Sequence, residues 1–123
     1  MVSPPLSRIL PTISAGGVLG ALTRYGIGVA WPADPAGFPW ATWTINVTGC
    51  FLIGVLLTAL PRPGYLRPLL GTGFLGGYTT FSTAIVDLQH VPVPVALAYL
   101  PATLLGALLA VWLGSILAER VTR

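Results

Sequence analysis

The chain contains no lysine and very few charged residues of any kind. Of its 123 residues, 7% are charged and 54% are hydrophobic, and the mean hydropathy is +0.85. A soluble domain of this size needs many more polar residues to cover its surface, so the composition excludes one. The net charge of +3 comes from arginines near the ends of apolar stretches. That distribution is typical of membrane topology and not of a nucleic-acid-binding surface.

Cysteine and histidine each occur once, as Cys50 and His90. A single cysteine excludes an intrachain disulfide, and we expect Cys50 to be a small buried apolar residue. His90 and Asp87 fall at the end of an apolar stretch, where we expect both to be solvated. They have no third partner for a metal, and no nucleophile–base pair is evident, so the sequence does not indicate an enzyme.

Acidic residues are missing from the middle of every apolar stretch. The chain has three, Asp34, Asp87 and Glu119, and we expect none at mid-depth in a membrane. A small multidrug transporter of similar length would need a carboxylate there to exchange protons for cations. The absence favours an anion path, in which amides and hydroxyls offer hydrogen-bond donors to the ion.

Four apolar stretches make up most of the chain, at residues 9–30, 41–60, 66–88 and 95–117. Each is long enough to cross a bilayer core of about 30 Å as a helix. The sequence therefore predicts an all-α membrane protein, with a single domain over residues 1–123 and four transmembrane helices. A signal peptide is the alternative for the first stretch, but that run is too long and lacks a clear cleavage site.

Small residues indicate where these helices approach closely. Gly16 and Gly20 lie four residues apart, a spacing that brings helix backbones together in membranes. Four short helices enclose little on their own, and their glycine and alanine content suggests faces that pack against another subunit. We therefore expect a dimer.

The third stretch contains the most unusual pattern, GTGFLGGYTTFST at residues 71–83. Glycine is a poor helix former, and hydroxyl groups compete for backbone hydrogen bonds, so we predict a break near Gly76 and Gly77. Backbone groups freed at membrane depth must be buried in protein or line a polar cavity. The rings of Phe74, Tyr78 and Phe81 surround the break, and their electropositive edges can face an anion. We interpret this segment as the functional centre.

Polar residues in the first two stretches point to the same function. Asn46 shares a helical face with Thr42 and Gly49. Its amide either joins two helices or lines an ion path, and we favour the path because Thr42 lies on the same face. Arg24 lies about two turns from the end of its stretch. It either reaches the membrane interface or holds an anion or a helix end.

The fourth stretch contains a short polar row. Tyr99 and Thr103 stand one turn apart on one face, and the next position in the row is Ala107. Pro101 should loosen the helix there by removing a backbone donor. The uncharged donors available to an ion are those of Thr42, Asn46, Thr80, Ser82, Tyr99 and Thr103.

The arginines are strongly biased to one side of the predicted membrane. With four spans, both termini and the loop before the third span lie on the same side, which holds Arg8, Arg62, Arg67, Arg120 and Arg123. Only Arg24 leans toward the other side. By the positive-inside rule, both termini are expected in the cytoplasm, in one fixed orientation. The bias argues against antiparallel pairing with an identical chain and allows pairing with a different one.

Three segments resemble the signatures of the Fluc (CrcB-type) fluoride channels. They are GALTRY at residues 20–25, TINVTGCF at 44–51 and GFLGGYTTFST at 73–83. The resemblance covers the whole four-span length. It implies an antiparallel dimer in the bacterial inner membrane, with two pores for passive fluoride export and a structural sodium ion at the dimer centre.

The same resemblance implies roles for individual residues. The backbone carbonyls of Gly76 and Thr79 would bind the sodium ion. Residues of the fluoride pathway would be Phe81 as the first fluoride-facing ring, Asn46 as the pore amide, Thr42 as its polar neighbour, Tyr99 and Thr103 as the start of a polar track, and Arg24 as the vestibular arginine.

Two positions depart from the family pattern. Ala84 stands where the family has a second phenylalanine, and Ala107 stands where a hydroxyl is usual. Together with the arginine bias, these departures predict a heterodimer with an inverted, paralogous chain that supplies a complete set of pore residues, in preference to a homodimer. The alternative is a structural subunit that does not conduct.

Overall fold

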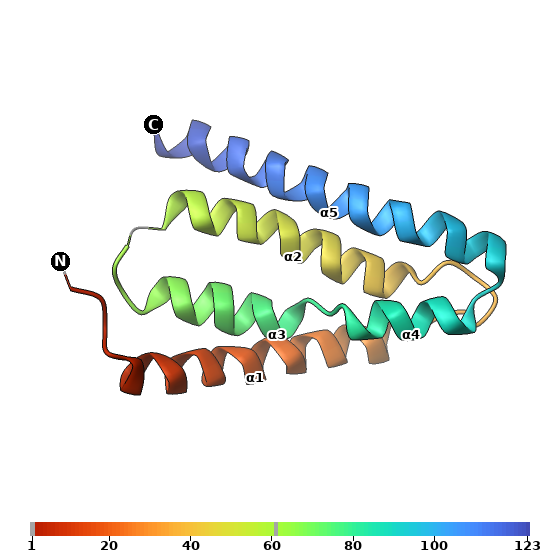
Figure 1. Cartoon of the computed structure of the whole chain (residues 1–123), viewed down its shortest axis with the longest axis horizontal. Coiled ribbons are helices and arrows are strands. Elements are labelled where there is room, and N and C mark those ends of the chain that lie inside the picture. The colour runs from red at the N-terminus through yellow and green to blue at the C-terminus, as the bar shows by residue number, and fades with distance from the viewer. Residues whose placement is uncertain (1, 61) are drawn as a thin grey trace.

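The computed structural model describes residues 2–60 and 62–123, and all regular structure in these ranges is helical (Figure 1). The third span is divided, because a π-helix and a short α-helix are separated from a further α-helix by three residues outside any helix. The elements are α1 (Leu6–Ala30), α2 (Trp40–Ala59), the π-helix η1 (Pro68–Leu75), α3 (Gly76–Tyr78), α4 (Ser82–His90) and α5 (Val93–Thr122).

The helical segments lie roughly alongside one another, and the chain reverses direction at each connection (Figure 1). Both termini and the connection between α2 and η1 lie at one end of the bundle. The other two connections lie at the opposite end. This is the alternation expected of four spans, and it gathers Arg62, Arg67, Arg120 and Arg123 at the end where the chain begins.

Three of the helices are long and apolar enough to cross a membrane, namely α1, α2 and α5. Their outward faces carry large apolar side chains, such as Leu22 on α1 and Leu105 and Leu108 on α5, which are 60%, 67% and 69% exposed. Large apolar side chains are more stable in contact with lipid hydrocarbon than with water. The remaining predicted span, the third, is the divided segment η1–α3–α4.

Glycines set the close contact between α1 and the segment η1–α3. Gly16 and Gly20 are buried, and a Cβ atom at either would overlap the backbone of Leu69 or Phe74. The close approach predicted from their spacing is therefore confirmed. Without side chains in the way, the two helices pack backbone to backbone, which strengthens dispersion contacts in lipid.

A second pair of helices, α2 and α5, packs in the same manner. Gly54 of α2 lies against the carbonyl oxygen of Val111, and Gly114 of α5 lies against that of Phe51. The bundle thus consists of two glycine-lined helix pairs. Cys50, on α2, is only half-buried in the single chain, so the expectation that it is buried is not met.

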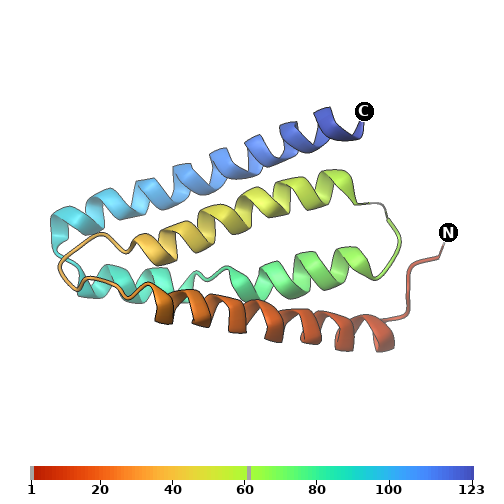
Figure 2. The same ribbon diagram turned by 180° about the vertical axis from the view of Figure 1, so that it is seen from behind.

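The predicted break in the third span is confirmed, but it begins two residues beyond Gly77. Gly76 has helical dihedral angles (φ −62°, ψ −39°), Gly77 is also within α3, and the chain first leaves the helix at Thr79, whose ψ is 153°. The kink is visible between α3 and α4 in both views (Figure 2). Gly77 is needed for contact instead, because a Cβ atom there would overlap the carbonyl oxygen of Gly17 on α1. Glycine at this point therefore serves helix packing, and other groups open the helix.

Candidate functional site

The side-chain amide of Asn46 holds the helix open at Thr80. Its Nδ2 donates to the carbonyl oxygen of Thr80, and its Oδ1 accepts from the amide of Thr80, each at 2.8 Å. Asn46 is buried, at 8% exposure. An unbroken helix would direct the Thr80 amide to the carbonyl of Gly76 four residues earlier. The asparagine thus replaces the hydrogen bonds that the backbone gives up at the break.

The hydroxyl of Thr80 restarts the helix on the far side of the break. Its Oγ1 accepts a hydrogen bond from the amide of Thr83, at 3.1 Å, in the first turn of α4. It also lies 3.1 Å from the hydroxyl of Thr83 and 3.3 Å from that of Ser82. A side-chain oxygen that accepts from a first-turn amide satisfies a donor that the new helix would otherwise leave unpaired. The Thr-rich sequence therefore ends one helix and begins the next.

Arg24 of α1 secures the other edge of the break. Its Nε donates to the carbonyl oxygen of Gly77 at 3.1 Å. That carbonyl belongs to the last turn of α3, where acceptors lack helical donors and the helix dipole is negative. Arg24 thus contacts a helix end, one of the roles that the sequence left open.

The carbonyl of Gly76 is freed by the same arrangement, because the Thr80 amide bonds to Asn46. Gly76 is exposed on the surface of the single chain, and Thr79 has an extended backbone. Within the described residues, no group of histidine, cysteine or acidic side chains could hold a metal ion. A cation bound here would depend on backbone carbonyl oxygens, the ligands that unwound membrane helices offer to sodium. The carbonyls of Gly76 and Thr79 have the right chemistry for that ion.

A groove beside the break brings several of the predicted residues together. It has a volume of about 480 Å³ and lies between the end of α1, the start of α2 and the restart of the third span. Arg24, Thr42, Thr80 and Thr83 line it. Tyr25 also lines it, so the groove combines one guanidinium with four hydroxyl-bearing side chains beside an otherwise apolar wall.

The aromatic ring predicted for this site lies elsewhere in the single chain. Phe81, within the break, is 79% exposed, and Ser82 is exposed beside it. Neither lines the groove beside Arg24. Ala84, in the first turn of α4, is buried at 6% exposure. The ring of Phe81 thus projects from the surface at the level where the backbone is interrupted.

The polar row of α5 forms a separate buried feature. Tyr99 is 1% exposed, and its ring meets that of Phe38 edge to face, with 5.2 Å between the ring centres. The hydroxyls of Tyr99 and Thr103 are both buried, with no hydrogen-bond partner among the described residues. The structure confirms that the two hydroxyls share a face, but it does not bring them to the groove lined by Arg24 and Thr42.

One neighbour of the site was predicted wrongly, and one contact beside it was not predicted at all. Asp87, expected to be solvated, lies within α4 with its Oδ2 buried and without a described partner. The helix restarts at Ser82 and includes Asp87 well before its end, which keeps the carboxylate near the bundle. His90 is exposed, as expected, and its Nδ1 lies 2.8 Å from the carbonyl of Val86.

A hydrogen bond between the third span and α2 was not predicted from the sequence. The hydroxyls of Tyr78 and Thr48 lie 3.0 Å apart.

These features define a small helical membrane protein whose third span is interrupted at a site of hydroxyls, one amide and one guanidinium. The family model described as "CrcB-like protein, Camphor Resistance (CrcB)" matches residues 12–115. The chain belongs to this family, which confirms the resemblance found in its sequence.

Several curated relatives match over most of their length. A protein named fluoride-specific ion channel FluC 1 from Streptomyces coelicolor is 43% identical, over 94% of this chain and 80% of its own. FluC 2 from Nocardia farcinica is 48% identical, over 91% and 86%. FluC 2 from Thermobifida fusca is 51% identical, over 84% and 82%.

Proposed function

We propose that this chain is a subunit of a fluoride channel that lets fluoride leave the cell passively and so reduces its toxicity. The observation that carries the proposal is the clamp of Asn46 on Thr80, which opens the third span and places uncharged donors around the opening. Burying a bare small anion costs on the order of tens of kcal/mol in an idealised apolar medium, and closely spaced donors offset that cost. The names of the curated relatives give independent support.

The surface of the break supports assembly with a second chain. Gly76, Phe81 and Ser82 are exposed in the single chain at the point where the backbone is interrupted. Interrupted backbone is not tolerated against lipid, so protein must cover it. An inverted second chain would place its own break against this one. Carbonyls of Gly76 and Thr79 would then hold a structural sodium ion between the two chains.

The fluoride pathway that we propose uses residues from both the groove and the polar row. Asn46 and Thr42 would offer donors near the break, and Thr80 and Ser82 would add hydroxyls. Arg24, which lines the groove, would attract the anion at the vestibule without binding it at the centre of the path. The ring edge of Phe81 would face fluoride, and Tyr99 and Thr103 would continue the path with hydroxyls that have no partner in the single chain.

A paralogous partner fits the charge distribution better than an identical one. Five of the six arginines lie toward the end of the bundle that holds both termini. That bias would place both termini in the cytoplasm, and an identical inverted chain would have its arginines on the wrong side. Ala84 and Ala107 also leave this chain short of a ring and a hydroxyl. Among the curated relatives, the names FluC 1 and FluC 2 both occur.

Fluoride efflux from liposomes tests the proposal. We expect little or no efflux from the chain alone and rapid efflux when the paralogous chain from the same genome is co-reconstituted. Chloride efflux in the same vesicles should stay at background. Rapid fluoride efflux from the single chain would refute the heterodimer. Absence of efflux from every combination would favour the non-conducting structural subunit.

A further inference from the structure

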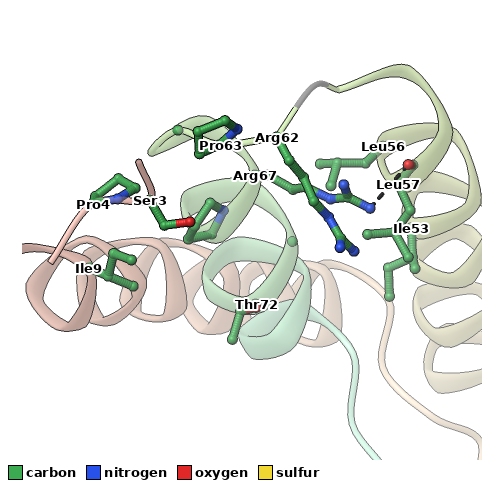
Figure 3. A pocket seen from close by; sticks show the side chains of 13 residues that line it. Ser3, Pro4, Ile9, Ile53, Leu56, Leu57, Arg62, Pro63, Arg67 and Thr72 are labelled. Atoms are coloured by element: carbon green, nitrogen blue, oxygen red, sulfur yellow. Dashed lines mark hydrogen bonds between the residues drawn. The ribbon is translucent and has the colours of Figure 1, made fainter. Parts of the chain in front are cut away.

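A second groove lies at the end of the bundle that holds the termini, away from the helix break. It has a volume of about 510 Å³ and is enclosed by the start of the chain, the end of α2 and the start of the third span (Figure 3). Its rim contains the arginines Arg62 and Arg67, and Ile9, Ile53 and Leu56 contribute to its walls. The fluoride pathway does not use any of these residues.

The two arginines are held differently. Arg67 donates from Nη2 to the carbonyl oxygen of Leu57 at 3.1 Å (Figure 3). That carbonyl is in the last turn of α2, where acceptors lack helical donors, so Arg67 caps the helix and is fixed at the groove. Arg62 is exposed in the preceding loop, and its side chain reaches the same groove. One guanidinium is therefore preset and the other is free to adjust to a ligand.

The positive charge of this rim favours binding of an anion. The described residues that line the groove include two guanidinium groups and no carboxylate. Two like charges beside an apolar wall repel each other more strongly than they would in water, and a shared anion removes that repulsion. Phosphate matches a pair of guanidinium groups especially well, because each can donate two parallel hydrogen bonds.

The apolar walls of the groove indicate that the anion belongs to a ligand with an apolar part. Aliphatic side chains of Ile53, Leu56 and Leu57 extend from the rim toward the middle of the bundle along α2. The end of α2 at Ala59 puts the rim at the level where a span leaves the bilayer core. A free phosphate would use only the rim, whereas a phospholipid would fill both parts, with its phosphate at the arginines and an acyl chain on the wall.

We propose that this groove binds one anionic phospholipid in the leaflet on the side of the termini. Its phosphate lies between Arg62 and Arg67, and one acyl chain covers the wall formed by Ile53 and Leu56. A bound lipid there joins the end of α2 to the start of the third span. The interaction is independent of fluoride passage and does not require the second chain.

Lipid retention during purification tests the site. The chain is extracted from vesicles of equal parts phosphatidylglycerol and phosphatidylcholine with matched acyl chains, and the retained lipid is quantified by mass spectrometry. We expect phosphatidylglycerol to be enriched roughly 10- to 30-fold over phosphatidylcholine, the effect of two arginines at a membrane surface. The double variant Arg62→Gln, Arg67→Gln should lose this enrichment.

The double variant Arg120→Gln, Arg123→Gln is the matched control, because it removes the same charge from the exposed end of α5 at the same end of the bundle. It should retain the enrichment. Equal loss of enrichment in both double variants would show that general surface charge causes it, and would overturn the site. Full enrichment in the variant Arg62→Gln, Arg67→Gln would also overturn the site. Displacement of the lipid by millimolar glycerol phosphate would assign the rim to free phosphate esters instead. Melting temperatures of both variants confirm that each remains folded.

Discussion

Asn46 and Thr80 are joined by two hydrogen bonds of 2.8 Å, one to the carbonyl and one from the amide of the same residue. A primary amide carries both a donor and an acceptor, so it can satisfy both halves of a peptide unit at once. This pair connects α2 to the break in the third span, and so links the two glycine-lined helix pairs of the bundle. Asn46 therefore stabilises the break together with Arg24 and the Thr80 hydroxyl.

Replacing Asn46 should destabilise the fold as well as slow fluoride passage. Asn46→Leu preserves the approximate volume but leaves the amide and carbonyl of Thr80 without partners, which should lower the free energy of unfolding by about 2–4 kcal/mol. Unfolding in mixed detergent micelles measures this. Thr44→Val is the control, since Thr44 lies on the same helix and its hydroxyl has no hydrogen-bond partner among the described residues. Equal stability of the wild-type chain and Asn46→Leu would contradict the clamp.

Two glycines of α1 offer a matched pair for testing the packing. A Cβ atom at Gly20 would overlap the Phe74 carbonyl, whereas nothing lies within 4 Å of one at Gly26. Gly20→Ala should therefore destabilise the chain by about 1–3 kcal/mol. Gly26→Ala should be neutral or stabilise by up to about 1 kcal/mol, because alanine favours helix. The two melting temperatures should move in opposite directions or differ clearly, and identical shifts would argue against this contact.

Phe81 should matter for passage and little for the stability of the single chain. Its ring is 79% exposed, so Phe81→Ala removes few contacts within the chain. If the ring faces fluoride in the assembled channel, efflux from co-reconstituted vesicles should fall roughly tenfold, a barrier increase of about 1.4 kcal/mol. Leu22→Ala, at an exposed apolar position on α1, is the control and should leave efflux unchanged. Unaltered efflux in Phe81→Ala would remove the ring from the pathway.

Sodium should be required for the assembled channel. If carbonyls of Gly76 and Thr79 hold the ion between two chains, replacing sodium with the large cation N-methylglucamine throughout purification should abolish efflux and shift the dimer toward monomers on size-exclusion chromatography. Readdition of sodium should restore both properties. Efflux that is the same in the two cations would exclude a structural sodium ion at this position.

Much of the architecture is evident from residue types alone. Apolar runs of sufficient length must be helical in lipid, because only a helix satisfies every backbone group within its own segment. The spacing of Gly16 and Gly20 likewise indicated a close helix contact, and the GTGFLGGYTTFST run indicated an interruption. These features are local in the chain, which is why a linear pattern reveals them.

The position of the break depended on contacts between segments distant in sequence. Helix propensity pointed to Gly76 and Gly77. Gly77 instead packs against α1 within the helix, and Asn46 competes for the backbone at Thr80, three residues after Gly77. The amide of Asn46 could be assigned to helix contact or to an ion path from sequence, and only its distance to Thr80 showed the contact. The burial of the Asp87 Oδ2 atom has the same origin, since it follows from where α4 restarts.

By itself, the sequence of this protein determined the membrane setting, the number of spans, the interrupted third span and the family, because each depends on composition or on short contiguous patterns. Tertiary structure alone decided where the interruption falls, which groups satisfy it, and which side chains share a groove. Those outcomes arise from competition between helix propensity and hydrogen bonds offered by neighbouring helices, and a neighbour in space has no fixed distance along the chain.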